Sequence, residues 1–147
     1  MGKFIRLKKG FNISLAGKAT AKVVEADPAE TVSIKPADFH GLYMPKVVVK
    51  EGDAVKAGSP LFHDKKFESI QFTSPVSGEV VEVKRGDKRK LIEVKILADR
   101  KNEYESFGRH SVSDIANLPV ESIKDQLLKS GVWVNLVQRP FGTIADP

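Results

Sequence analysis

The stretch Val49–Gly58 reads VKEGDAVKAG, and Ser74–Val80, further along the chain, reads SPVSGEV. In both stretches glycine falls where a tight turn calls for a positive φ, and valine lies between the turns, where it can fill a small core. Leu61 continues the spacing of the first stretch. Together they predict short strands joined by tight turns.

The surrounding residues, from about 31 to 98, continue this pattern. Thr31–Lys35 alternates polar and apolar residues, as a half-buried strand does, and Lys90–Leu97 behaves in the same way. The second of these strands is expected to place three apolar side chains on one face: Ile92, Val94 and Ile96. Regularly spaced short strands with no helical period between them indicate a small all-β sandwich or barrel.

A short internal repeat fits this interpretation. VKEGD at 49–53 recurs as VKRGD at 83–87, so two strands each run into a Gly-Asp turn. The repeat suggests two halves related by a pseudo-twofold axis, although five residues can also recur by chance.

The N-terminal segment, residues 1–26, is expected to contribute a strand that packs on the rest of the protein. Its apolar residues Phe11, Ile13 and Leu15 alternate with polar ones, and glycines flank them.

The character of the chain changes in its last part, residues 99–147. A polar linker comes first, and a helix is expected at about 119–130, because four apolar residues share one helical stripe: Val120, Ile123, Leu127 and Leu128. Asn117 can cap this helix, Pro119 suits its first turn and Gly131 suits its end. The chain ends soon after this helix, which suggests a fragment whose remainder would cover it.

Composition excludes several classes of protein. The chain has 147 residues, of which 41% are hydrophobic and 29% charged, and its longest apolar runs are three residues, whereas a membrane-spanning helix needs about 20. No membrane span is therefore expected. Cysteine is absent, which excludes disulfides, thiolate metal sites and a thiol nucleophile within this sequence.

The chain is basic, with 24 Lys and Arg against 19 Asp and Glu. Two clusters supply much of the excess, one at Lys3–Lys9 and one at Lys84–Lys90. Such patches can meet nucleic acid, anionic lipid or an acidic protein face, or can simply be solvated strand ends. Phe4 is the only aromatic residue in either cluster, so nucleic acid, which needs interleaved stacking residues, is not an expected partner.

No catalytic or metal site is predicted. The histidines His40, His63 and His110 are far apart and lack metal-ligand spacing. Ser77 lacks the preceding glycine of a nucleophile elbow.

The glycine and valine spacing of the two opening stretches resembles the lipoyl/biotinyl-carrier, or barrel-sandwich hybrid, family. Carriers of this kind present a modified lysine on the hairpin between the two motifs, where this sequence reads DKKFE at Asp64–Glu68. The resemblance leaves open a carrier function with a modified lysine near Lys65 or Lys66, although the methionine flanks of a biotinyl site are missing.

A closer resemblance extends over nearly the whole chain. Strings in the same order resemble the A subunit of the sodium-translocating NADH:ubiquinone reductase family: KKGFNISLAG at 8–17, VKEGDAVKAG at 49–58, LFHDKK at 61–66, FTSPVSG at 72–78, RGDKR at 85–89, SGVW at 130–133 and RPF at 139–141. The resemblance implies a mixed β plus α/β protein, with a barrel-sandwich hybrid domain at 27–98 followed by the start of an α/β region. Family members continue far past residue 147.

The resemblance also implies a function. Members of this family are peripheral components on the cytoplasmic face of the bacterial inner membrane, in a complex that passes electrons from NADH through flavins and iron centres to ubiquinone and exports Na⁺. The expected partners are the other subunits of the complex, especially a membrane-embedded one, together with ubiquinone. The fragment itself is expected to bind no cofactor and to have a docking, structural or quinone-proximal role. Trp133, Arg139 and Phe141 are candidates for quinone proximity, although Trp133 and Phe141 could as easily be core contacts for the region beyond residue 147.

Overall fold

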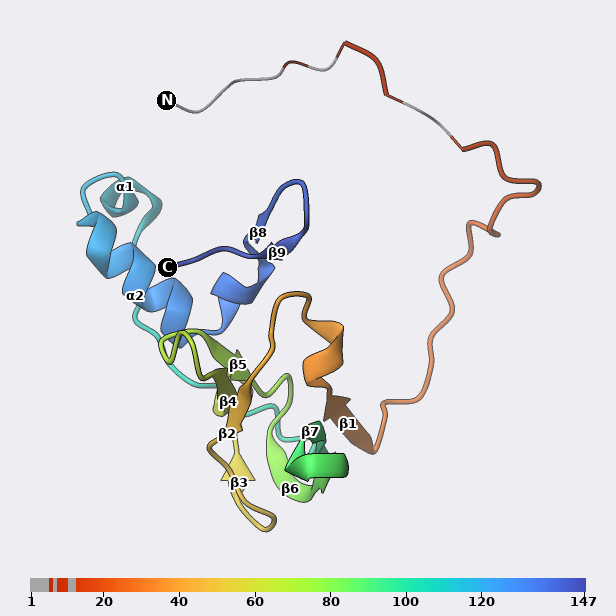
Figure 1. The fold of residues 1–147 in the computed structure, drawn as a ribbon, viewed down its shortest axis with the longest axis vertical. Coiled ribbons are helices and arrows are strands. Elements are labelled where there is room, and N and C mark those ends of the chain that lie inside the picture. Colours follow the sequence, from red (N-terminus) through yellow and green to blue (C-terminus); the bar gives the residue numbers. More distant parts are fainter. Residues whose placement is uncertain (1–5, 7, 11–12) are drawn as a thin grey trace.

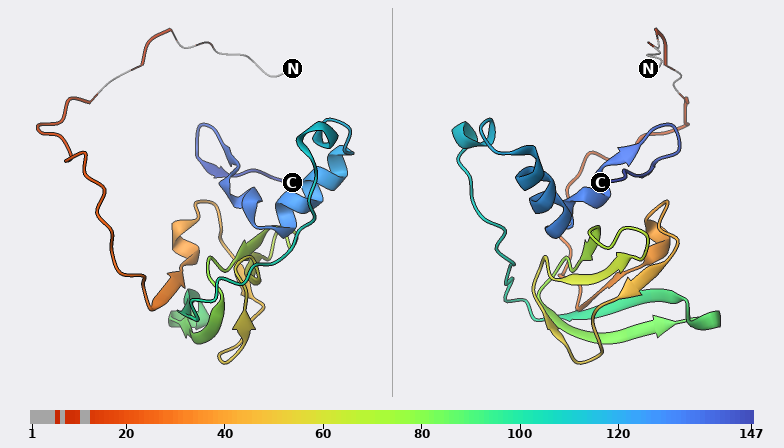
Figure 2. Two further views of the ribbon diagram at one scale, coloured as in Figure 1. Left: turned by 180° about the vertical axis from the view of Figure 1, so that it is seen from behind. Right: turned by 60° about the vertical axis from the view of Figure 1, so that its left-hand side comes forward.

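A computed structural model describes residues 6, 8–10 and 13–147 of the chain, and its main body is a sandwich of two antiparallel sheets (Figure 1). The larger sheet has the order β1-β7-β6-β3, with the bounds Thr31–Ile34, Leu91–Ala98, Gly78–Arg85 and Ala54–Val55. The smaller sheet has the order β2-β4-β5, with the bounds Pro45–Val47, Pro60–Asp64 and Gln71–Thr73. Figure 2 shows the long β6–β7 hairpin lying across the smaller sheet. The expected barrel-sandwich architecture is present.

The hydrophobic core lies between the two sheets. Its largest fully buried side chains come from four strands: Leu61, Phe62, Phe72, Val80, Val94 and Ile96. The rings of Phe62 and Phe72 stack with their centroids 4.9 Å apart, and Phe39 packs edge-on against Phe72 at 4.7 Å. Offset and edge-on aromatic contacts of this kind add to the free energy gained by burial alone.

The prediction that Ile92 shares the buried face of β7 with Val94 and Ile96 is wrong. Val94 and Ile96 are buried as expected, but Ile92 is 42% exposed and Leu91 is buried instead. The β6–β7 register explains this, because Lys84 pairs with Glu93 while Arg85 pairs with Leu91, so that Ile92 is an extra, unpaired residue. A bulge of this kind reverses the alternation of side chains along the strand.

The two halves of the VKEGD/VKRGD repeat meet in the structure. The side chain of Glu51 accepts a 2.9 Å hydrogen bond from the backbone N–H of Val83, and Gly52 donates its N–H to the carbonyl of Val80. The two turns differ, however, since Gly52 has a φ of +91° whereas Gly86 has a φ of −103°.

The prediction of an N-terminal strand is wrong for the residues that the structure describes. Residues 13–29 form neither helix nor strand and are exposed, and Figure 1 shows them swinging away from the sandwich. Residues 11 and 12, which include Phe11, lie outside the described residues. Alternation indicates a strand only where the segment pairs with the edge of another strand, and residues 13–29 make no such pairing.

The C-terminal part contains two helices and a small hairpin. The elements are α1 (Val112–Ile115), α2 (Val120–Lys129), a 3-10 helix η3 (Val132–Asn135), β8 (Val137–Gln138) and β9 (Thr143–Ile144). The helix expected at 119–130 is confirmed, and Gly131 ends it with a φ of +74°. Pro119, rather than Asn117, stands at its N-terminal cap position.

Only one end of α2 packs against the sandwich. Leu127 and Leu128 are half-buried against the core, whereas Val120, from the same predicted stripe, is exposed. In the part of the chain that the structure describes, α2 and the other helices are too short and too polar to cross a bilayer.

Candidate functional site

The three residues singled out from the sequence lie in one segment but in different environments. Trp133, in η3, is 8% exposed and belongs to the hydrophobic core. Its indole Nε1–H donates a 2.9 Å hydrogen bond to the carbonyl of Ala145, just beyond β9. Trp133 therefore braces the base of the β8–β9 hairpin and does not line an open site.

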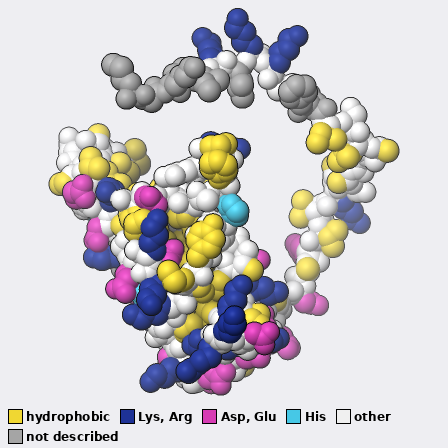
Figure 3. All heavy atoms as spheres, in the orientation of Figure 1, with side chains coloured by type: hydrophobic (Ala, Val, Ile, Leu, Met, Phe, Trp, Pro, Cys, Tyr) yellow, Lys and Arg dark blue, Asp and Glu magenta, His cyan; other side chains and the backbone are white. Residues whose placement is uncertain are grey.

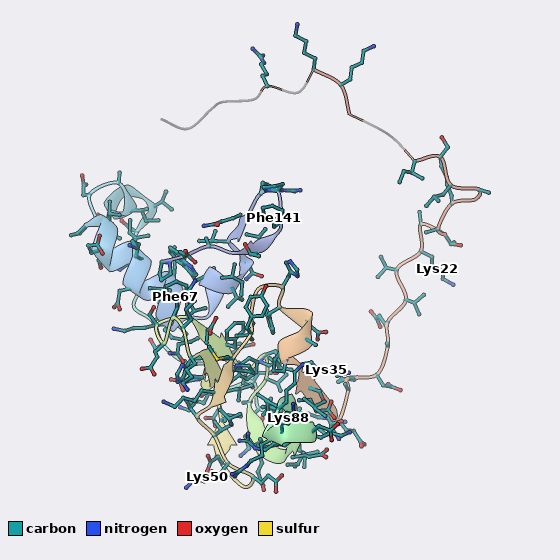
Figure 4. All side chains as sticks on the ribbon, viewed as in Figure 1. Lys22, Lys35, Lys50, Phe67, Lys88 and Phe141 are labelled. Atoms are coloured by element: carbon teal, nitrogen blue, oxygen red, sulfur yellow. The ribbon has the colours of Figure 1, made fainter. Side chains whose placement is uncertain are left out.

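Arg139 and Phe141 lie at the other end of this hairpin. Both are exposed, and the Phe141 ring is 79% exposed at the tip of the loop, pointing away from the sandwich (Figure 4). The loop is closed by a 2.7 Å hydrogen bond from the N–H of Gly142 to the carbonyl of Gln138. The structure thus brings Arg139 and Phe141 together at the tip and separates them from Trp133.

Other exposed apolar side chains accompany Phe141 in the sequence. Val132, Leu136 and Val137 are each about half exposed. Exposed aromatic and aliphatic residues, with an arginine in the same short segment, have the composition typical of a protein contact surface. We call residues 132–144 the hairpin segment.

A cavity of about 320 Å³ lies between the hairpin segment and the turn around Phe39. Its lining includes Phe39, His40, Val134 and Asn135. In the sequence His40 stands only as an isolated histidine, because nothing in the linear pattern shows that residues 38–40 approach residues 134–144. No motif could have revealed this cavity.

The lysines considered for a carrier function lie between β4 and β5, on the expected hairpin. Both are held through their backbone, since the N–H of Lys65 donates to the carbonyl of Met44 and that of Lys66 donates to Asp64 Oδ1 at 2.9 Å. The Lys66 ammonium lies 4.5 Å from the centre of the Phe67 ring. A cavity of about 180 Å³ separates Lys66 and Phe67 from the C-terminal residues Thr143–Asp146, so this hairpin borders another part of the chain.

Each histidine has different surroundings in the structure. His63 is buried, with its Nδ1 3.1 Å from the carbonyl oxygen of Asp64, while His110 contacts the Gln126 amide. Among the described residues, no three histidine or acidic side chains gather closely enough to hold a metal ion.

Ser77 has a structural partner. Its buried hydroxyl donates a 2.6 Å hydrogen bond to Asp99 and accepts one from the backbone N–H of Glu103. The hydrogen bond from Ser77, helped by one from the N–H of Lys101, lowers the pKa of the Asp99 carboxyl below its ordinary value. This arrangement joins the sandwich to the linker that follows β7.

Comparison with known proteins gives the chain a family. Residues 5–99 match the family model described as the NqrA N-terminal barrel-sandwich hybrid domain. The chain is 37% identical over 143 residues to the A subunit of the Na(+)-translocating NADH-quinone reductase of Pseudomonas aeruginosa, covering 97% of this chain and 32% of the relative. It is 39% identical over 140 residues to the protein of the same name from Neisseria meningitidis serogroup A, covering 95% of this chain and 31% of the relative.

These comparisons confirm the family resemblance found in the sequence. The chain spans about a third of the length of the curated relatives that it matches. The family match covers the whole two-sheet sandwich, from β1 to the end of β7, and leaves α1, α2 and the hairpin segment outside it. The chain belongs to the NqrA N-terminal barrel-sandwich hybrid domain family.

Proposed function

We propose that this chain is the N-terminal part of the A subunit of a Na⁺-translocating NADH:quinone reductase and that it serves as a docking module. In this role it is a peripheral component on the cytoplasmic face of the bacterial inner membrane. NADH, flavins, iron centres and ubiquinone are used by the complex, and the chain itself holds none of the redox cofactors. The names and the coverage of its relatives support this assignment.

The observation that carries the docking role is the exposure of Phe141 on a braced hairpin. A bare phenylalanine ring at a loop tip gains free energy only when a partner covers it, and rigid aromatic anchors supply much of the energy in protein interfaces. The Trp133–Ala145 hydrogen bond fixes the base of this hairpin, so less conformational entropy is lost on docking. The exposed Arg139, two residues away in the same loop, adds a donor for carbonyl or carboxylate groups of the partner.

Retrieval from membranes tests the docking role. The tagged 147-residue chain is mixed with detergent-solubilised membranes that contain the complex, and the retained proteins are identified by mass spectrometry. We expect the other reductase subunits, and above all a membrane-embedded one, to be retained. Phe141→Ser is expected to reduce this retention by tenfold or more, which is the loss of about 1.4 kcal/mol.

Val112→Ser provides the matched control. Val112 is also an exposed apolar residue, but it lies on α1, outside the hairpin segment. Equal retention by the Phe141→Ser and wild-type chains would remove the hairpin from the interface. Failure of both the chain and its full-length form to retain any reductase component would overturn the assignment.

A quinone-proximal role is a second candidate, favoured by the cavity of about 320 Å³ beside the hairpin segment. Its lining combines apolar side chains, such as Val134 and Ile144, with polar ones, and the imidazole of His40 would suit a carbonyl oxygen of a quinone. Trp133 is the only tryptophan and can report on this region. Titration with a water-soluble quinone should give saturable quenching beyond that of free indole, and His40→Ala should weaken it; quenching that is linear and matches free indole would exclude the role for this chain.

The carrier alternative ranks lower. A carrier lysine must present its amine free for modification, whereas the Lys66 ammonium lies 4.5 Å from the centre of the Phe67 ring and borders the cavity shared with Thr143 and Ile144. The intact mass of the chain purified from its natural host tests this directly. An added lipoyl or biotinyl mass that is lost in the Lys66→Arg or Lys65→Arg variant would establish the carrier function, and an unmodified mass would reject it.

A further inference from the structure

A groove of about 540 Å³ runs between the start of β2 and the turn that joins β6 to β7. Of the described residues that line it, none is acidic and five are cationic: Lys46, Lys65, Arg85, Arg89 and Lys90. These cations come from three separate parts of the sequence, so folding brings them together. We call this surface the basic groove.

Most of these positive charges lack a nearby counter-charge. Within the described residues, carboxylates stay more than 4.0 Å from the charged nitrogens of Lys65, Arg85, Arg89 and Lys90, while Lys46 lies 3.6 Å from Glu68. The Arg85 guanidinium instead donates a 3.3 Å hydrogen bond to the carbonyl of Arg89, across the same turn. An anionic partner would therefore meet cations that no described carboxylate has neutralised.

The turn between β6 and β7 places cationic residues in an unfavourable backbone conformation. Lys88 and Arg89 have φ values of +53° and +61°, in the left-handed region that glycine and asparagine adopt more readily. Two long cationic side chains at such consecutive positions extend the basic surface around the β6–β7 end. Figure 3 shows dark blue side chains gathered there, beside the magenta of acidic ones. Asp87 lines the adjoining groove and is the acidic residue within the turn itself.

Apolar groups lie among these charges. Tyr43 is 80% exposed and Met44 is 54% exposed, and both line the basic groove. Tyrosine is suited to the headgroup level of a membrane because its ring is apolar and its hydroxyl is polar, and the long stems of lysine and arginine lie well at the same depth. Cations alone would suit any acidic polymer, whereas the exposed Tyr43–Met44 pair favours a surface with an apolar interior.

We propose that the basic groove binds the surface of a lipid bilayer that contains anionic lipid. Each lysine or arginine near such a surface contributes about 1 kcal/mol, and an inserted apolar side chain adds to this. The proposal goes beyond the docking role proposed above, because it needs no other protein of the complex. It assigns the β6–β7 end of the sandwich to the membrane and leaves the hairpin segment free for a protein partner.

Sedimentation with vesicles tests the proposal on the full 147-residue chain. Phosphatidylcholine vesicles with and without phosphatidylglycerol are compared at low and at high salt. We expect binding only to the vesicles with phosphatidylglycerol, and weaker binding as salt rises, because screening shortens the reach of the charges.

A double variant, Lys88→Asn with Arg89→Asn, removes two cations while keeping residues that tolerate the left-handed conformation. Since 1 kcal/mol is about a fivefold change in affinity, we expect binding to fall by roughly twenty- to thirtyfold. The matched control is Arg100→Asn with Lys101→Gln. Arg100 also has a positive φ, of +59°, but lies at the opposite end of β7. This control variant should change vesicle binding by about twofold at most.

A second pair of measurements separates a bilayer from an acidic protein. Tyr43→Ser with Met44→Ser should weaken vesicle binding several-fold while leaving binding to polyglutamate unchanged. The proposal is overturned if the Lys88/Arg89 variant binds vesicles as well as the wild type. Equal losses in the Arg100/Lys101 control, or binding to polyglutamate without binding to vesicles, would overturn it too.

Discussion

The hydroxyl of Ser77 donates a 2.6 Å hydrogen bond to the carboxylate of Asp99, which joins the residue before β6 to the residue after β7. The same hydroxyl accepts a hydrogen bond from the N–H of Glu103 at 3.0 Å. Beyond this point Glu105 donates its N–H to the carbonyl of Ala57, so the linker runs alongside the sandwich before α1 begins. The buried Ser77 and the backbone contacts of Ala57 together fix the path by which the chain leaves the barrel-sandwich domain.

This relationship predicts a pH dependence of stability. The Ser77 hydrogen bond favours the ionised form of Asp99 and lowers its pKa in the folded state. A lowered pKa contributes stability above the unfolded-state value of about 3.9, and this contribution is lost as the pH falls through the folded-state pKa. The difference in urea-unfolding free energy between the wild-type and Ser77→Ala chains should therefore be largest near neutral pH and should shrink below about pH 4.

Ser69→Ala controls for the loss of a hydroxyl, because Ser69 is exposed. It should leave the stability curve unchanged at every pH. A Ser77→Ala difference that stays constant from neutral pH into the acid range would show that the ionisation of Asp99 is not linked to folding through this contact.

Gly78 cannot be replaced by alanine without displacing the backbone. A Cβ at this position would lie 1.9 Å from the carbonyl oxygen of Leu97, on the paired strand. A backbone atom cannot move aside as the end of a flexible side chain can, so Gly78→Ala should lower the unfolding free energy by about 3 kcal/mol or more.

Gly52→Ala is the comparison, because Gly52 has a φ of +91° but open space around it. It should cost about 1–2 kcal/mol, the cost of the left-handed conformation alone. Equal losses, measured by urea denaturation, would contradict this steric account.

The turn glycines were predictable because their requirement is local. Gly52, Gly58 and Gly78 all have positive φ values, as the opening sequence motifs predicted. The helix at Val120–Lys129 was predictable for a similar reason. Its apolar stripe and the glycine that ends it, Gly131, both lie within one short stretch of sequence.

The features that could not be predicted from the sequence depend on contacts between distant segments. The bulge at Ile92 depends on the register of β7 against β6, which no single strand specifies. The candidate residues 133, 139 and 141 are close in sequence but separate in the structure. Trp133 is buried in the core, whereas Arg139 and Phe141 lie exposed at the hairpin tip. The basic groove likewise appeared in the sequence only as the cluster at Lys84–Lys90, without the contribution of β2.

The stacked pair at the centre of the sandwich should dominate its stability. Phe72 is fully buried, and its ring contacts both Phe62 and Phe39. Phe72→Ala should lower the unfolding free energy by about 3–5 kcal/mol, because it removes buried apolar area and leaves a cavity. Phe141→Ala, at the exposed hairpin tip, should change it by less than about 0.5 kcal/mol. A large loss from Phe141→Ala in a denaturant titration would show that the ring is part of the folded core and not a contact surface.

The hydrogen bond from Trp133 to the carbonyl of Ala145 should control the local stability of the hairpin segment. Trp133→Phe keeps an aromatic ring in the core but removes the Nε1–H donor to the Ala145 carbonyl, a loss of about 1 kcal/mol. The amide of Ala145, which donates to the carbonyl of Leu136, should then exchange its hydrogen faster, whereas the amide of Val94 in β7 should change only as far as global stability does. If both amides change by the same factor, the hairpin unfolds only together with the sandwich, and the tip bearing Phe141 is rigid even without this hydrogen bond. If Ala145 alone responds, Trp133 holds the hairpin in place, and Trp133→Phe should also weaken retention of the reductase subunits without altering the Phe141 ring.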